Sequence, residues 1–330
     1  MDELDLQLMR RIGVTPFLVW PHPLRSMRPS SLARSLKVST DTVKRRLSAM
    51  QEVGVFHGVR VYPNPRLLGL RLATLHFTMG AAGRKRVSSE QVAEVPGVLG
   101  VCDLVGGGRT VDVAFHDDAG RDALRKELAR LLGATASQLM DYPAPRPTRK
   151  LSRLDWRILQ ALRSAADSSP EEAARSLGVS VRTVKRRFDR MAEDGALDVI
   201  GLFNPGAIDG HLIVELLVHL VPGSRASDIA VVLNALRSRW FAQWSPPDGK
   251  LGHLALLTVA RSAHELEGLR REAESLASVE RCEVLVFDGA LQDWNLLDAG
   301  IGQRAASPLA VAPPARKQVP AIVAARPRAR

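Results

Sequence analysis

The chain has 330 residues, a length that suggests two domains, and its 45% hydrophobic and 25% charged residues exclude wholesale disorder. Its 46 Lys and Arg against 35 Asp and Glu give a formal net charge of +11, which favours a polyanionic partner such as nucleic acid. The two cysteines, Cys102 and Cys282, cannot build a disulfide framework, no apolar run has the length of a membrane span, and the acidic start MDELDLQLMRR is unlike a signal peptide. We therefore expect a cytoplasmic protein with no membrane association.

The positive charge is unevenly distributed. Residues 1–150 carry a net charge of +9, residues 151–300 of −4 and residues 301–330 of +6. The end of the chain is rich in Ala, Pro and Arg without a helical or strand period. We therefore predict a disordered basic tail over residues 291–330.

Residues 1–65 predict a helix-turn-helix domain. Apolar residues recur with helical spacing from Leu4 to Ile12, and a second short helix is expected at Ser31–Leu36. Ser39 then stands at the N-cap position of a third helix, whose apolar face runs from Val43 to Met50. Between the first two helices, Val14–Arg25 is an insertion, interpreted either as a loop over the core or as a contact with a second chain or regulatory partner.

Residues 66–142 predict a ferredoxin-like sandwich, in which four antiparallel strands carry helices on one face. Strand-like and helix-like segments alternate and are interrupted by a glycine turn. In chain order they are strand Arg71–Met79, helix Ser88–Val95, strand 98–105, turn Gly106–Gly108, strand 110–115, helix Ala119–Leu132 and strand Ser137–Asp141.

After a Pro-rich basic linker at residues 143–150, the pattern repeats. Residues 33–54 and 174–195 are identical at 14 of 22 positions without gaps, including the whole Thr-Val-Lys-Arg-Arg core. We interpret the chain as a tandem duplication, with a second helix-turn-helix domain at 151–205 and a second sandwich at 206–290. The predicted segments of this sandwich are strand His211–Val221, helix Ala226–Arg237, strand Phe241–Trp244, turn 246–249, strand Leu251–Ala260, helix Ala263–Leu276 and strand Val279–Phe287.

The predicted fold class is therefore α+β: two tandem copies of a winged helix-turn-helix followed by a βαββαβ sandwich. A capped, basic third helix is typical of the recognition helix that a helix-turn-helix places in the major groove. A lone basic triplet is often only a solvated helix face, but this one recurs in the same register after the same cap. Acidic neighbours weaken the field of the second copy. The predicted DNA-contacting residues are Ser39, Thr40, Thr42, Lys44, Arg45, Arg46, Ser180, Arg182, Thr183, Lys185, Arg186 and Arg187.

The helix openings LDLQLM and LDWRIL, the block SLARSLKVSTDTVKRRLSAMQEVGV and the segment GVLGVCDLVGGGRTVDVAF together resemble the Lrp/AsnC family of feast/famine transcriptional regulators. The resemblance spans residues 1–290 as two copies. It implies a sequence-specific regulator of double-stranded DNA whose sandwiches pair as an internal pseudo-dimer and form a homo-oligomer. It also implies an amino acid or related small molecule as effector, which we assign to Gly106, Gly107, Gly108 and Asp112; the glycines alone predict only a tight hairpin.

Signatures of catalysis are missing from the sequence. The eight histidines form no HExxH motif, no Cys-x-x-Cys accompanies them, and neither a P-loop nor a nucleophile elbow occurs. We therefore predict no catalytic residue, no metal site and no cofactor. Two alternatives stay open. One is a fused enzyme that resembles the sirohaem decarboxylases on the same fold, and the other is a protein-interaction scaffold.

Overall fold

The computed structural model describes residues 2–12, 29–79, 87–142, 147–163, 169–204, 207–208, 210–237, 239–244, 252–292 and 295–306. None of the helices in these ranges combines the length and the apolar composition that a membrane span requires. Three predicted features lie wholly or partly outside them: the Val14–Arg25 insertion, the turn at 246–249, and residues 143–146 of the linker. Residues 307–330 of the predicted tail also lie outside the described residues.

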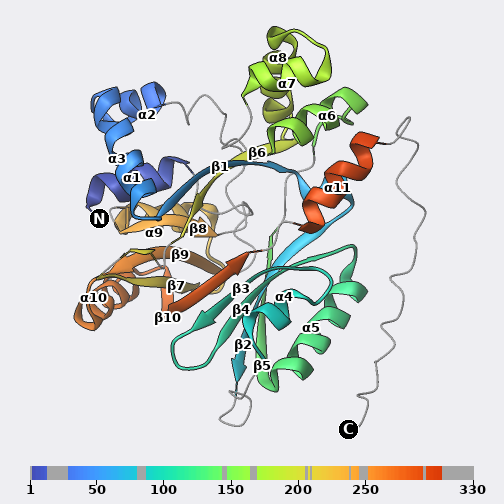
Figure 1. The fold of residues 1–330 in the computed structure, drawn as a ribbon. Coiled ribbons are helices and arrows are strands. Elements are labelled where there is room, and N and C mark those ends of the chain that lie inside the picture. Colours follow the sequence, from blue (N-terminus) through green and yellow to red (C-terminus); the bar gives the residue numbers. More distant parts are fainter. Residues whose placement is uncertain are drawn as a thin grey trace.

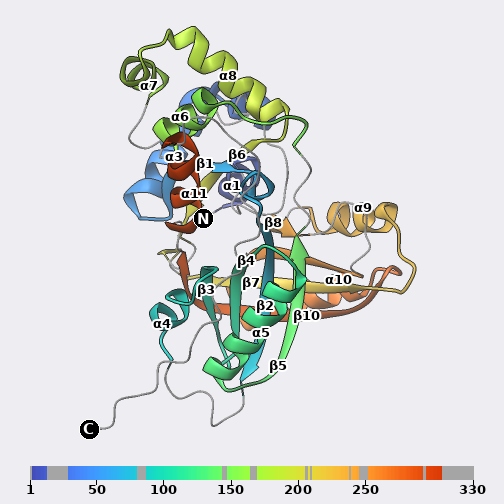
Figure 2. The same ribbon diagram turned by 90° about the vertical axis from the view of Figure 1, so that its right-hand side faces the viewer.

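Two winged helix-turn-helix units lie above the sheet in Figures 1 and 2. The first unit consists of α1 (Glu3–Ile12), α2 (Pro29–Leu36), α3 (Thr40–Glu52) and the wing strand β1 (Phe56–Pro63). The second unit consists of α6 (Arg153–Leu162), α7 (Pro170–Leu177), α8 (Val181–Glu193) and the wing strand β6 (Leu197–Phe203). Both have the three-helix order predicted from the repeated sequence block.

Each unit is followed by a four-stranded half-sheet of βαββαβ order, which confirms the predicted fold class. After the short helix η2 (Pro65–Leu68), the first contains β2 (Arg71–Met79), α4 (Ser89–Ala93), β3 (Val98–Leu104), β4 (Arg109–Phe115), α5 (Asp118–Leu132) and β5 (Ala134–Tyr142). The second contains β7 (Leu212–Leu220), α9 (Ala226–Ala235), β8 (Trp240–Trp244), β9 (His253–Ala260), α10 (Ala263–Glu274) and β10 (Val279–Gln292).

The two halves of the chain are joined by two antiparallel strand pairs. β3 and β10 pair edge to edge, with Cys102 opposite Ala290, and so produce one eight-stranded sheet of order β5-β2-β4-β3-β10-β7-β9-β8. The wings β1 and β6 pair separately, with Val61 opposite Val199. Backbone hydrogen bonds in both pairs satisfy strand edges that would otherwise be open.

Each helix-turn-helix unit contacts the half-sheet that comes from the other half of the chain. The core of the first unit includes Ile213 and Leu257 of the second half-sheet, and Arg10 of α1 lies 4.3 Å from the ring centre of Trp240 at the start of β8. The core of the second unit includes Leu72 and Leu99 of the first half-sheet. Each unit therefore packs partly on the half-sheet that belongs to the other half of the chain.

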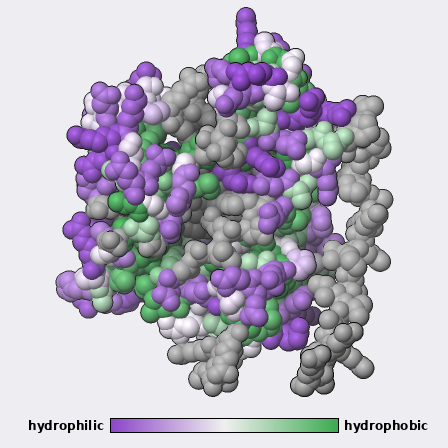
Figure 3. All heavy atoms as spheres, viewed as in Figure 1, coloured by the Kyte–Doolittle hydropathy of each residue, from purple (hydrophilic) through white to green (hydrophobic). Residues whose placement is uncertain are grey.

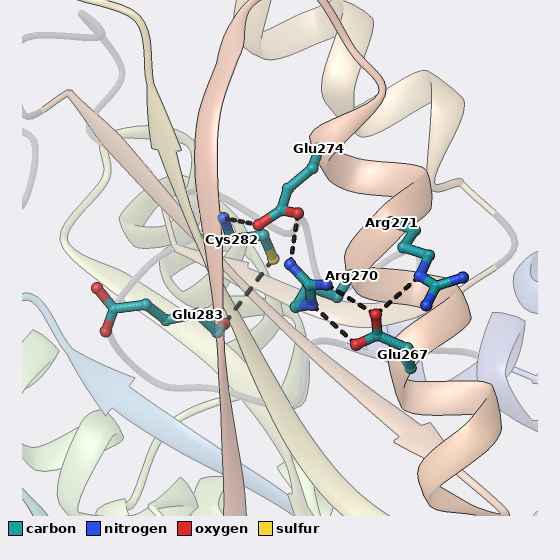
Figure 4. Close-up of polar contacts among 6 residues, drawn as sticks. All are labelled: Glu267, Arg270, Arg271, Glu274, Cys282 and Glu283. Carbon is teal, nitrogen blue, oxygen red and sulfur yellow. Dashed lines mark hydrogen bonds and ion pairs between the residues drawn. The ribbon is translucent and has the colours of Figure 1, made fainter.

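Helices cover one face of each half-sheet, and the opposite faces meet. In the second half-sheet, α10 is held to β10 by Glu274, which accepts a hydrogen bond from the Cys282 amide at 3.0 Å, and Glu274 also pairs with Arg270 (Figure 4). On the uncovered faces, His76 of β2 lies 3.7 Å from Glu215 of β7. Three strands separate β2 from β7, about 19 Å on a flat sheet, so the sheet bends strongly.

The predicted start of the tail at residue 291 is wrong. β10 continues to Gln292, and helix α11 (Asn295–Ala306) follows it. Leu297, Ile301 and Ala305 of α11 are buried in the core of the second helix-turn-helix unit, against α6. Apolar residues four apart form the buried face of this helix, a pattern hidden by the Ala-rich composition around it.

Candidate nucleic-acid interface

The third helix of each unit begins with the same hydroxyl cap. In α3, the Ser39 hydroxyl accepts a hydrogen bond from the Thr42 amide at 3.0 Å, and the two hydroxyl oxygens are 2.8 Å apart. Ser180 and Thr183 make the same contacts in α8 at 3.1 and 2.9 Å. An N-cap hydroxyl satisfies an amide that the helix leaves without an internal partner. These four predicted contact residues therefore fix where each third helix starts.

The buried face of each third helix determines which side chains point outward. Val43 and Met50 of α3 are buried, as are Val184, Phe188 and Met191 of α8, at the spacing expected for a core-facing stripe. Basic residues of the predicted set lie on the exposed side. They are Lys44, Arg45, Arg182, Lys185 and Arg186, while Thr40 is half-buried. Figure 3 shows hydrophilic side chains over the helices at this end of the molecule.

The last arginine of each basic triplet contacts the first helix of its own unit. Arg46 places Nη2 at 2.7 Å from Asp2 Oδ2 and Nη1 at 3.4 Å from Asp5 Oδ2. Arg187 places Nη1 at 2.8 Å from Asp155 Oδ1. Arg46 and Arg187 therefore hold the third helix against the first, and their role as DNA contacts stays a prediction.

The Asp155 carboxylate is buried, with 2% of the residue exposed, but remains ionised at neutral pH. Burial raises the pKa of this carboxyl, whereas hydrogen bonds from Ser152 and Arg187 lower it by more and leave the pKa below its ordinary value. These ion pairs were not predicted from the sequence. Their signal was the Leu-Asp pair that opens both LDLQLM and LDWRIL, at Asp5 and Asp155.

One further cation of the predicted set has a partner. Lys185 Nζ lies 3.0 Å from Glu171 Oε1, and both side chains are about half exposed. Such exposed pairs contribute little to stability. Four predicted contacts form no ion pair with any described residue, and we refer to them as the outward cations: Lys44, Arg45, Arg182 and Arg186.

The acidic neighbours of the second unit reduce its positive field without cancelling it. An open hollow along α8 is lined by Val181, Arg182, Lys185, Arg186, Asp189, Arg190 and Glu193. Four of these side chains are cationic and two are anionic, so the lining keeps a net charge of +2. A phosphate backbone is attracted to a surface of this sign.

The four predicted effector residues lie in two different environments. Gly106 and Gly107 have φ angles of +94° and +90° and form the turn between β3 and β4, where residues with a side chain are strained. A Cβ on Gly108 would lie 3.1 Å from the Leu104 side chain. Asp112 instead lies within β4 and accepts a hydrogen bond from the Thr74 hydroxyl. The backbone geometry of the turn alone accounts for the three glycines, and effector binding stays a prediction.

A buried polar cluster lies where the half-sheets meet. It contains the predicted Asp112 together with His76 and Glu215, which were not predicted from the sequence. Burial raises the pKa of Glu215 to about 8 and of Asp112 to about 6, and it lowers the pKa of His76 to about 4. At neutral pH, therefore, the His76 ring is neutral, Glu215 is mostly protonated, and the 3.7 Å contact between them is not a charged pair. The signal in the sequence was a single Glu within the apolar strand LIVELLVHL. The described residues contain no cluster suited to a metal ion.

Comparisons with known proteins found one matching family and several similar solved structures. The winged helix-turn-helix DNA-binding family matches residues 151–197. The siroheme decarboxylase NirDL in co-complex with an iron-uroporphyrin III analogue is 14% identical, with a TM-score of 0.52, over 88% of this chain and 93% of that one. A second NirDL structure is 13% identical, with a TM-score of 0.52, over 92% and 98%. Escherichia coli AsnC is 20% identical, with a TM-score of 0.33, over 42% and 92%. No protein with a curated description matches the chain by sequence.

These comparisons place a winged helix-turn-helix DNA-binding domain in the second half of the chain. The match covers all of α6, α7 and α8, and therefore includes Arg182, Lys185 and Arg186. The NirDL likeness extends over nearly the whole chain, so both winged units and both half-sheets have counterparts in a known fold. At 14% identity this likeness describes the fold alone.

Proposed function

We propose that the chain is a sequence-specific DNA-binding transcriptional regulator of the Lrp/AsnC type. The observation that carries the proposal is the recurrence of one arrangement in both units: a hydroxyl-capped third helix, a buried apolar stripe and outward cations. The first two features fix the helix in position. The third presents Lys and Arg to phosphates and base edges, as a recognition helix in the major groove does.

A single chain supplies two recognition helices in this proposal. Dyad-related DNA sites are usually read by two subunits. Here the β1–β6 and β3–β10 pairs, together with the crossed packing of the units, support an internal pseudo-dimer. We also propose, from the resemblance to the family, that such chains associate further and that a small-molecule effector acts at the half-sheets.

Catalysis is not part of the proposed function. Selection of bound fragments from genomic DNA with the full chain tests the proposal, and it predicts one enriched sequence motif. The interaction-scaffold alternative predicts no enriched motif, and that result would contradict DNA-specific binding. The variant that lacks the four outward cations serves as the matched negative control, because the caps and the Asp–Arg pairs that hold the helices are left in place.

A second candidate function is favoured by the NirDL likeness over nearly the whole chain. In that alternative the chain acts on an acidic tetrapyrrole, and the buried cluster of His76, Asp112 and Glu215 is a set of titratable groups where the half-sheets meet. Incubation of the full chain with sirohaem separates the candidates. The regulator proposal predicts neither a retained tetrapyrrole absorbance band nor loss of the mass of carbon dioxide from the substrate.

A further inference from the structure

The first turns of the two third helices, where a recognition helix meets base edges, differ in charge. α3 begins Thr40-Asp41 and α8 begins Val181-Arg182, whereas the next five residues, Thr-Val-Lys-Arg-Arg, are the same in both. Asp41 and Arg182 occupy equivalent positions in the first turn, and both are exposed. The same surface position therefore carries a negative charge in one unit and a positive charge in the other.

The difference does not come from a different way of holding the helix. Ser39 and Ser180 cap the two helices at equivalent positions with the same hydroxyl contacts, and Arg46 and Arg187 bind carboxylates at the start of the first helix in each unit. The wings pair antiparallel with each other. Two helices held alike will present Asp41 and Arg182 at matching places on the DNA.

Opposite charges at matching places select different bases. Arg donates two hydrogen bonds to O6 and N7 of guanine in the major groove, whereas Asp accepts from the N4 amino group of cytosine. The N-terminal residues of a recognition helix make such contacts. A perfectly palindromic site would offer both helices the same base and would leave one of these two side chains without its hydrogen bonds.

We propose that one chain reads a non-palindromic operator, in which Arg182 selects a guanine in one half-site and Asp41 selects a cytosine at the equivalent position of the other. The proposal rests on the proposed DNA-binding function. It makes Asp41 and Arg182 the residues that determine the difference between the half-sites. It also gives the bound chain one fixed orientation on the DNA.

Selection from random duplexes with the full chain tests the proposal, with wild type beside the symmetrised variant Thr40→Val/Asp41→Arg. Wild type is expected to enrich a motif with unequal half-sites. The variant is expected to enrich a palindrome built from the guanine-containing half-site, and to prefer it over the wild-type operator by about tenfold or more. The reciprocal variant Val181→Thr/Arg182→Asp is expected to enrich the other palindrome. Asp41 and Arg182 are exposed and Thr40 and Val181 are half-buried, so circular dichroism verifies that both variants fold.

The outcomes distinguish this proposal from the function on which it rests. A wild-type motif that is palindromic, or a symmetrised variant that keeps the wild-type motif, overturns the asymmetric operator while leaving DNA binding intact. Failure of wild type to enrich any motif overturns both the DNA-binding function and this proposal. Unequal half-sites that become equal in each symmetrised variant support it.

Discussion

The two helix-turn-helix units hold their third helices in the same way and expose different surfaces. The serine caps, the buried Val43 and Val184, and the arginine contacts to the first helix recur in both units. On the outside, Asp41 in one unit corresponds to Arg182 in the other. Some residues therefore fix the third helix in the fold and recur in both units, whereas surface positions such as Asp41 and Arg182 differ between the units. In the proposed function, the surface residues contact DNA.

The two half-sheets also have equivalent backbone positions that carry different side chains, in this case in the interior. Thr74 of β2 lies opposite Asp112 of β4 in the first half-sheet, while the equivalent β7 position is Glu215, opposite Leu257 of β9. A titratable group therefore comes from a different strand in each half. The Asp112 carboxyl contributes to the raised pKa of Glu215, so the two groups lie near each other, and this pair arises from a difference between the two halves.

The largest expected effect on stability comes from the Asp–Arg contact of the second unit, and the corresponding contact of the first unit should matter less. Arg187→Met leaves the buried Asp155 carboxylate without its cation and is expected to lower the free energy of unfolding by about 3 kcal/mol. Arg46→Met is expected to cost only about 1 kcal/mol. Its 2.7 Å contact is with the half-exposed Asp2, where solvent screens it, and its contact with the buried Asp5 is longer, at 3.4 Å. Urea unfolding of the full-length variants measures both. Equal losses would contradict the distinction, and Asp155→Asn should restore stability to the Arg187→Met variant.

The pH dependence of stability tests the buried interface of the half-sheets. The folded chain keeps the Glu215 proton up to its raised pKa of about 8, whereas the unfolded chain loses it near 4.5, so this contribution to stability falls as pH rises. Asp112, with its raised pKa, also makes the free energy of unfolding fall as pH rises towards 6. His76, with its lowered pKa, makes the free energy of unfolding rise between pH values of about 4 and 6.5. Between pH 6.5 and 8, Glu215 alone of these three residues is expected to change the free energy of unfolding, which should fall by about 1.4 kcal/mol per pH unit.

The variant Glu215→Gln is expected to remove this fall in stability between pH 6.5 and 8. Melting temperatures of the full chain across that range measure the effect. Glu52→Gln, an exposed carboxylate at the end of α3, is the matched control and should leave the slope unchanged. A wild-type slope in the Glu215→Gln variant would show that another group carries the pH dependence.

The two serine caps are expected to contribute equally to the stability of the chain. Ser39→Ala and Ser180→Ala each remove one hydroxyl cap of similar geometry and should each lower the free energy of unfolding by about 1 kcal/mol. Urea unfolding measures the loss, and replacement by Asp, which also caps helices, should restore most of it. A loss confined to one unit would break the correspondence of the two helices.

The smallest expected effect concerns the acidic neighbour of the second unit. Glu171 pairs with Lys185, and the equivalent position of the first unit is Ser30. Glu171→Gln releases Lys185 and removes a negative charge, so DNA affinity should rise by about threefold at low salt and by less at high salt. Ser30→Glu should lower affinity by a similar factor. Fluorescence anisotropy with a selected duplex measures both, and a fall in affinity for Glu171→Gln would contradict this role.

Local pattern was enough to predict most of the fold. Helical spacing and the position of Ser39 and Ser180 predicted both third helices and their caps, and the alternation of strands and helices predicted each half-sheet in the observed order. These features depend on residues close together in sequence, and the repetition of the block gave each prediction twice. The outward position of Lys44, Arg45, Arg182 and Arg186 followed from the same spacing.

Contacts between distant segments could not be predicted in this way. The β3–β10 and β1–β6 pairs join strands far apart in the chain, and any exposed strand edge could have formed them. The crossed packing of the units depends on those pairs. Helix α11 was missed because its apolar residues pack on α6 of the second unit, a surface defined only in the folded chain.

The most direct test of the central claim is the affinity of the full chain for a selected duplex at moderate salt, with and without the outward cations. Two variants lose the same charge. The first replaces the outward cations by Ala at Lys44, Arg45, Arg182 and Arg186. The control replaces four cations of α5, which packs on the first half-sheet away from both third helices, by Ala at Arg121, Arg125, Lys126 and Arg130. We predict a loss of about 100-fold or more for the first variant and of less than about threefold for the control. Equal affinities of wild type and the first variant would contradict the account.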